Sequence, residues 1–201
     1  MRHAVPRSKT RRGKINGLEK TGSRCALASG ARKPNLFQFK NDGETPNNPK
    51  KWPLVIYRSP VHLRDGFDPA AIFEELFASN GWQDSWRDGV YDFLHFHAHR
   101  HEALGIARGH VDVAFGGTNA RRLRLKAGDV AILPAGTGHK RVEATGDLLV
   151  VGAYPQSSGA YDEPKPTEVD HQKAASDIAA VPAPKTDPVY GREGPLMAIW
   201  R

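Results

Sequence analysis

The sequence is poor in cysteine and contains no long run of apolar residues. Its single cysteine, Cys25, excludes an internal disulfide and lies in a polar, basic stretch, which favours an incidental thiol over a catalytic one. No stretch approaches the roughly 18 consecutive apolar residues of a membrane-spanning helix, and the first residues contain no hydrophobic block of the signal-peptide kind. We therefore expect a soluble, cytoplasmic protein with no membrane partner.

Positive charge is abundant but is confined to one part of the chain. The 201 residues carry 29 Lys and Arg against 22 Asp and Glu, a formal net charge of +7. Residues 1–33 hold ten of these basic residues and one acid, so residues 34–201 have a formal charge of −2. The basic segment has few apolar residues and no helical or strand period, which predicts a disordered extension. A polyanion contact, a targeting arm and an over-extended reading frame all fit this composition, and nucleic acid is not the expected partner.

Residues 34–201 have the length of a single domain, and the 39% hydrophobic content of the chain is enough for a core. A helix is predicted within DPAAIFEELFASNGW, residues 68–82, where Asp68 suits the N-cap, Pro69 the first turn and Gly81 the stop. Four apolar residues between these signals recur at helical spacing: Ile72, Phe73, Leu76 and Phe77. This is the one clear helix signal before the β-rich part of the chain.

Short apolar segments punctuated by glycine and proline dominate the rest of the domain. They are predicted to form strands, at residues 51–59, 90–97, 102–109, 110–117, 121–128, 129–136 and 147–155. Such close spacing predicts an all-β antiparallel barrel or sandwich. After Tyr154 the chain becomes polar and rich in proline. We expect it to wrap the barrel in extended segments, with one short helix near residues 169–180.

Four histidines and one glutamate fall within eight residues, HFHAHRHE, at positions 95–102. In a strand, His95 and His97 point to the same face, and Glu102 at the start of the next strand can bring a carboxylate to that side. A mixed set of imidazoles and carboxylate suits one divalent transition metal, and the spacing does not choose among Fe, Mn, Ni, Zn and Cu. A fourth ligand has to come from elsewhere in the fold.

Two spaced motifs resemble those of the cupin superfamily. The first is matched at every fixed position, by Gly89, His95, His97, Glu102 and Gly109. The second is matched by Gly128, Pro134, Gly136 and His139. It departs at its last position, where Glu143 replaces the usual asparagine. The segments NGWQDSWRDGVYDFLHFH and VPAPKTDPVYGREGPL further resemble single-domain bacterial cupins of the YjlB kind, a likeness that covers residues 34–201.

The resemblance implies a cupin jelly-roll barrel, which is an antiparallel double sheet, with one short N-terminal helix, a metal site inside and, commonly in cupins, a homodimer. It supplies His139 as the missing ligand, beside His95, His97 and Glu102. The departure at Glu143 is not at a ligand position of the family, so it leaves the site intact. Two alternatives stay open: a barrel that has lost its metal, and a site in which His101 replaces Glu102.

Such a centre leaves about one or two coordination positions for a small polar substrate. Iron would favour a dioxygenase, whereas Mn, Ni or Zn would favour an isomerase or lyase in which Glu102 moves a proton. We therefore predict a metal-dependent enzyme with Glu102 as its catalytic residue. The alternative is a noncatalytic cupin that binds or senses a small molecule. The substrate is not identified, because the inward-facing residues of the barrel are not fixed by the pattern.

Overall fold

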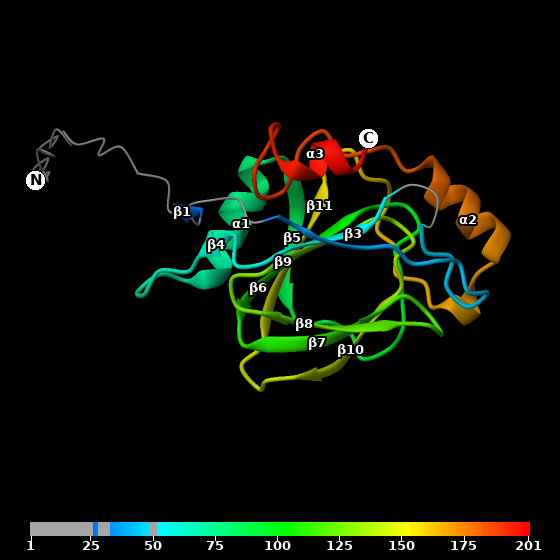
Figure 1. Ribbon diagram of the computed structural model, residues 1–201, viewed down its shortest axis with the longest axis horizontal. Coiled ribbons are helices and arrows are strands. Elements are labelled where there is room, and N and C mark those ends of the chain that lie inside the picture. The colour runs from blue at the N-terminus through cyan, green and yellow to red at the C-terminus, as the bar shows by residue number, and fades with distance from the viewer. Residues whose placement is uncertain (1–25, 28–32, 49–51) are drawn as a thin grey trace, which may run out of the picture.

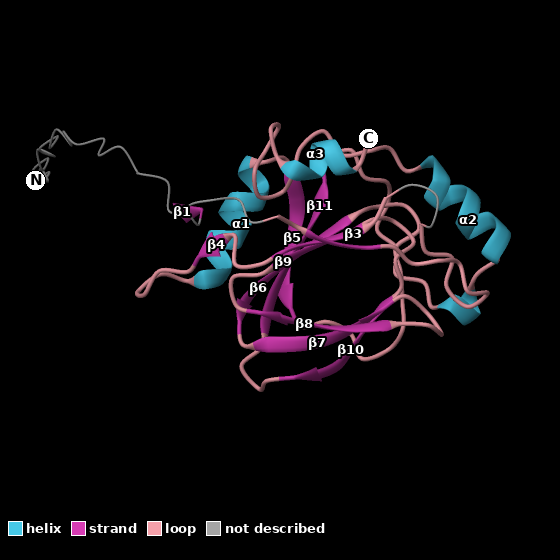
Figure 2. Cartoon of the chain, in the orientation of Figure 1, coloured by secondary structure: helices cyan, strands magenta, loops and turns pink. Residues whose placement is uncertain are grey.

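The structure is a computed structural model that describes residues 26–27, 33–48 and 52–201. Two antiparallel sheets face each other at its centre, and the helices lie around them (Figures 1 and 2). Within these residues, every helix is too short or too polar to cross a lipid bilayer. Most of the predicted basic extension, residues 1–33, lies outside the described residues.

The larger sheet has six antiparallel strands. From edge to edge they are β2 (Asn35–Phe37), β3 (Leu54–Tyr57), β9 (Val130–Leu133), β6 (Glu102–Arg108), β11 (Leu149–Pro155) and β5 (Trp82–Asp88). On β6 the side chains alternate between two cores, with Leu104 and Ile106 in the space between the sheets and Ala103 and Ala107 on the outer face. Glu102 lies two residues before Leu104 on the same strand, so its side chain also faces the space between the sheets.

The smaller sheet has three antiparallel strands. They are β10 (His139–Ala144), β7 (His110–Phe115) and β8 (Arg121–Lys126). Its apolar residues Val111, Val113, Phe115 and Leu125 pack with those of the larger sheet in one core. The predicted all-β, double-sheet architecture is confirmed. No hydrogen-bonded ladder joins the two sheets in the described part of the chain, so the expected barrel is not closed.

Helix α1 (Pro69–Ser79) covers the outer face of the larger sheet, as predicted. Asp68 caps it, because a carboxylate oxygen of Asp68 accepts a hydrogen bond of 3.1 Å from the backbone N–H of Ala70. Phe73 packs so closely on β6 that a Cβ atom at Gly105 would overlap its ring. The absence of a side chain at Gly105 therefore allows the helix to lie flat against the sheet.

The residues after β11 wrap around the sandwich (Figure 1). They contain η1 (Pro166–Glu168), α2 (His171–Ala180) and α3 (Pro195–Ile199). The predicted helix near residues 169–180 is thus confirmed as α2. Helix α3 was not predicted, since it has only five residues and follows a segment, residues 188–194, that contains proline and two glycines.

A buried carboxylate fixes this wrapping segment to the larger sheet. Asp187 is fully buried and accepts a hydrogen bond of 2.6 Å from the Tyr57 hydroxyl. It also accepts backbone N–H groups of Val189, Tyr190 and Leu196, at 2.8, 3.1 and 3.2 Å. Four donors therefore compensate the loss of hydration of one carboxylate.

Three local predictions differ from the structure. Residues 90–97, predicted as a strand, form an irregular loop in which His95 makes an isolated bridge with His139. Strands β5 and β10 were not predicted, because most of their side chains are polar and exposed and lack the apolar alternation of a half-buried strand. Within the predicted extension, β1 (Ala26–Leu27) pairs with β4 (Val61–His62).

Candidate metal centre

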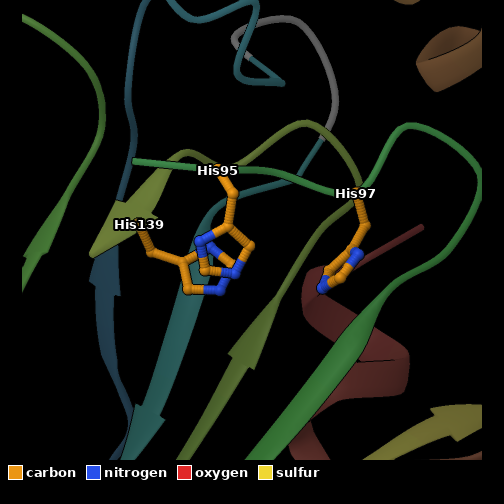
Figure 3. A group of neighbouring side chains, drawn as sticks. All are labelled: His95, His97 and His139. Atoms are coloured by element: carbon orange, nitrogen blue, oxygen red, sulfur yellow. The ribbon is translucent and has the colours of Figure 1, made fainter. Parts of the chain in front are cut away.

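Three histidines from two parts of the chain meet between the sheets. His95 and His97 lie on the loop before β6, and His139 is the first residue of β10. One ring nitrogen from each lies within 4.8 Å of the others, and all three residues are buried. Two backbone hydrogen bonds between His95 and His139, of 3.3 and 2.9 Å, hold the loop to the strand. Figure 3 shows the three rings pointing into one space.

The backbone orients each of the three rings in the same way. Nδ1 of His95 lies 3.2 Å from the carbonyl oxygen of Phe93, and Nδ1 of His139 lies 3.0 Å from that of Thr137. Nδ1 of His97 bonds to the carbonyl oxygen of Asp162. A carbonyl only accepts, so each Nδ1 carries the proton and each Nε2 keeps its lone pair. This is the arrangement in which an imidazole binds a metal through Nε2.

Glu102 brings a carboxylate to the same place. Its Oε2 atom lies 3.4 Å from Nε2 of His97 and 3.4 Å from Nε2 of His139. The residue is only 2% exposed, and among the described residues this oxygen has no hydrogen-bond partner. A buried carboxylate oxygen without a donor is costly, so the position is suited to a cation.

The ionisation of these groups follows from burial and mutual contact. Burial, and then the charge of His139, lowers the pKa of His95 to about 3, so His95 is neutral at physiological pH. Burial acts to lower the pKa of His97, but the negative charge of Glu102 outweighs it and the pKa is raised. Burial acts to raise the pKa of Glu102, but His97 and His139 outweigh it and the pKa is lowered. Glu102 is therefore an anion.

The two other histidines of the cluster lie away from this point. The Nδ1 atom of His101 accepts the backbone N–H of Ala135 at 2.9 Å, and its Nε2 atom lies 3.1 Å from the carbonyl oxygen of Pro182. Its ring also packs against Trp200, at 4.9 Å between centroids. Because both nitrogens of His101 face backbone groups, Glu102 is the better candidate for the fourth ligand. His99 is exposed and contacts carboxylates outside the cluster.

A cavity of about 480 Å³ opens next to the histidines. Besides the three histidines and Glu102, its walls include Trp86, Tyr91, Arg100, Leu104, Tyr154 and Tyr161. The indole N–H of Trp86 donates to the Tyr154 hydroxyl at 2.8 Å, whereas Trp82 is fully buried in the core. The cavity size is within the range of small-molecule sites.

Sequence reasoning did not find three of these wall residues. Arg100 lies between His97 and Glu102 of the first motif, and that position was the available signal. Tyr154 lies on the predicted last strand, but which face it occupies depends on a register that a sequence does not fix. Tyr161 lies in a polar, proline-rich segment that has no periodicity.

Comparison with known proteins identifies the family. No protein-family model matches the chain. The uncharacterised protein YjlB of Bacillus subtilis (strain 168) is 32% identical over 169 residues, which cover 84% of this chain and 98% of that protein. The chain belongs to the YjlB family of cupins. The relationship covers nearly the whole of YjlB, in agreement with the resemblance carried by the two motifs.

Solved structures similar to this YjlB-family cupin match it in part. A structure described as a DMSP lyase has 21% sequence identity and a TM-score of 0.32 over 40% of each chain. A mutant of Bacillus subtilis oxalate decarboxylase has 21% identity and a TM-score of 0.34, over 59% of this chain and 29% of that one. The YjlB-family chain therefore spans less than half of either protein.

The one departure from the cupin motifs in this YjlB-family chain lies away from the histidines. Glu143 is on β10, and its exposed carboxylate forms an ion pair of 2.7 Å with Arg122. The asparagine that usually stands there is thus replaced by a residue that forms an ion pair with β8, two strands away across the smaller sheet.

Proposed function

We propose that the chain binds one divalent transition metal through His95, His97, Glu102 and His139, and that it is a metal-dependent enzyme acting on a small polar molecule. The observation that carries the proposal is the buried Oε2 atom of Glu102, 3.4 Å from two Nε2 atoms and without a hydrogen-bond partner among the described residues. One cation would satisfy this oxygen and the lone pairs of all three rings.

The donor set supports a transition metal more than calcium or magnesium. Three imidazoles suit Fe, Mn, Ni, Zn or Cu, whereas calcium and magnesium prefer oxygen ligands. When bound, iron would supply oxygen chemistry of the dioxygenase type, and Mn, Ni or Zn would supply Lewis-acid chemistry of the isomerase or lyase type. The residues present therefore fit the group that the motifs imply.

The chain itself supplies a proton acceptor and a proton donor in the cavity. Glu102 is an anion, so once its carboxylate is released from the metal it can accept a proton from a bound molecule. Burial, and then the negative charge of Glu102, raises the pKa of Tyr154, whose hydroxyl therefore stays protonated. The wall of the cavity around these two groups includes the aromatic rings of Trp86, Tyr91 and Tyr161.

Elemental analysis of the full chain, purified without a metal-affinity tag, tests the proposal. We expect close to one transition metal per chain. Iron would direct the search to oxygen uptake, and manganese, nickel or zinc to isomerase or lyase assays. Ligands that bind in a metal-dependent way but stay chemically unchanged under air, with each candidate metal, would contradict the enzyme and leave a noncatalytic binder. Less than one tenth of a metal per chain would contradict the metal centre itself.

Three further expectations are part of this proposal. Residues 34–201 form a single cupin domain preceded by a basic extension, the chain forms a homodimer, and it functions in the cytoplasm. The homodimer is expected because cupins commonly form homodimers. Light scattering of the purified chain tests this expectation. A mass of one chain, unchanged across concentrations from micromolar to millimolar, would contradict it.

A further inference from the structure

Arg100 is a buried cation in the wall of the cavity. It is 5% exposed, and it lines the same space as the three histidines and Glu102. Its Nε and Nη2 atoms donate to the carbonyl oxygens of Ala160 and Gly159, at 3.3 and 2.5 Å. No carboxylate of the described residues lies within ion-pair distance of it. A buried guanidinium that has only neutral partners still lacks a countercharge.

Two tyrosines hold this guanidinium beside the histidines. Its central carbon lies 4.5 Å from the ring centroid of Tyr154 and 5.3 Å from that of Tyr161. The ring of His97 lies 5.8 Å from each of the same two rings. The rings attract the cation but do not neutralise it. A single aromatic ring thus separates Arg100 from the candidate metal ligands.

The charge in the cavity is not balanced by the protein. On the proposed function, a divalent metal and Arg100 face one buried anion, Glu102, which leaves a net positive interior. Asp84 and Asp88 also line the cavity, but both are exposed, so solvent and salt screen their charge. The Arg87 guanidinium lines the cavity too, and it is already paired with Asp68 and Glu74.

We propose that Arg100 binds a carboxylate of the substrate, and that the substrate is a small organic acid whose other oxygen-bearing end faces His95, His97 and His139. The inference rests on the proposed function and names its substrate class. An arginine has five N–H donors in a planar fork that matches a carboxylate, and two backbone carbonyls occupy only part of it. Hydroxy acids and oxo acids with a second, distant carboxylate combine the two required groups.

Titration calorimetry of the metal-loaded full chain with malate and with lactate tests this. Both acids carry the same hydroxyl and carboxylate pair for a metal, and malate adds a second carboxylate. We expect malate to bind the unchanged chain about 10-fold to 100-fold more tightly than lactate, the range that one buried charge-assisted contact provides. Arg100→Met should abolish this preference while lactate affinity and metal content stay the same.

Two further variants keep the test decisive. Arg100→Gln removes the charge but keeps a side-chain donor for the carbonyls of Gly159 and Ala160, so it replaces Arg100→Met if that variant does not fold. Arg87→Gln removes a cation from the same cavity, and it should keep the preference for malate because Arg87 already has carboxylate partners.

Two kinds of result would overturn the inference, and metal content separates them. A chain with full metal that binds malate no better than lactate, or an Arg100 variant that keeps the preference, refutes the carboxylate site alone. Equal loss of both acids in Arg100→Gln would make Arg100 a structural residue. A wild-type chain without metal would refute the proposed function and this inference together.

Discussion

The ring of His97 donates a hydrogen bond from Nδ1 to the backbone carbonyl of Asp162, a residue 65 positions further along the chain. The same residue also accepts the backbone N–H of Ala98 at 2.8 Å through its carboxylate. The segment that follows the last strand therefore holds the histidine loop from outside the sandwich. The geometry of the candidate metal centre depends on this long-range contact as well as on the strands.

The first prediction concerns the ligands. Replacing His97 or His139 with alanine should lower the metal content several-fold, because each removes one Nε2 donor from the centre. His99→Ala is the matched control and should leave the metal content nearly unchanged, since His99 faces Asp162 and Asp177 on the surface. Elemental analysis of the purified variants gives the answer, and equal loss in all three would show that the ligand assignment is wrong.

The second prediction concerns Glu102 as the group that moves a proton. Glu102→Gln keeps the shape of the side chain and removes its basicity, so turnover should fall by about 10² or more while ligand affinity is largely retained. Glu143→Gln, an exposed change on β10, should leave turnover as it is. The assay uses ligands found by thermal shift among hydroxy acids, diketones and sugars. Unchanged turnover in Glu102→Gln would remove Glu102 from the chemistry.

The third prediction concerns pH and the outer face of the smaller sheet. Hydrogen bonds from Arg124, and then Arg122, lower the pKa of Asp112 to about 2. A lowered pKa stabilises the folded state above the unfolded pKa of about 3.9, and this contribution is lost as the pH falls toward 2. Asp112→Asn should therefore lower the melting temperature by roughly 2–4 °C at pH 7 and by much less near pH 2.

The exposed Asp65, which has no ion-pair partner among the described residues, provides the control for Asp112. Asp65→Asn should leave the melting curve unchanged at both pH values. A stability difference for Asp112→Asn that is as large at pH 2 as at pH 7 would mean that packing, and not the ion pairs, is responsible.

The fourth prediction concerns the contact between α1 and the larger sheet. A methyl group at Gly105 would overlap the Phe73 ring, so Gly105→Ala should reduce the free energy of unfolding by roughly 1–3 kcal/mol. Gly146→Ala serves as the control, because a Cβ atom there meets nothing within 4 Å. Its effect should stay within about 0.5 kcal/mol in urea denaturation. A neutral Gly105→Ala would show that the helix can move away from the sheet at little cost.

The fifth prediction concerns the basic segment. Its sequence offers few apolar side chains, so deleting residues 1–25 should change neither the melting temperature nor the metal content. Deleting residues 1–33 also removes the pairing of Ala26 and Leu27 with β4, and should lower the melting temperature slightly. A drop of more than about 10 °C, well beyond the scale of a single contact, would show that the segment belongs to the core or to a dimer interface.

Much of the fold could be predicted from local patterns. The apolar stretches on β6, β7, β9 and β11 alternate or run continuously, and the helix α1 has both a cap and a stop. The strands β5 and β10 were missed because an exposed sheet edge is built from polar residues, which carry no periodic signal. Backbone pairing with a neighbour creates such strands, and a single sequence does not contain that information.

The residues that gather at the candidate centre were predicted, although the local structure behind one part of the argument was wrong. His95 and His97 were expected to share a face of a strand, yet they lie on a loop and meet because His95 pairs with His139 and His97 contacts Asp162. The prediction that these histidines come together rested on the spacing of the two motifs, because the alternation of side chains in a strand does not apply to a loop. The position of Arg100 in the cavity wall depends on the direction of its side chain, which the structure shows and the sequence does not.

The packing of His101 against Trp200 has a consequence for the order in which the centre can be completed. Trp200 stacks on Trp52, with 5.5 Å between the ring centroids, and also packs against the ring of His101. His101 in turn accepts the backbone N–H of Ala135, which lies in the second motif. A chain emerging from the ribosome carries its histidines long before it carries this support. A chain that ends before Trp200 therefore contains every candidate ligand but lacks the ring that packs against His101. The presence of all four candidate ligands is thus not enough to complete the site.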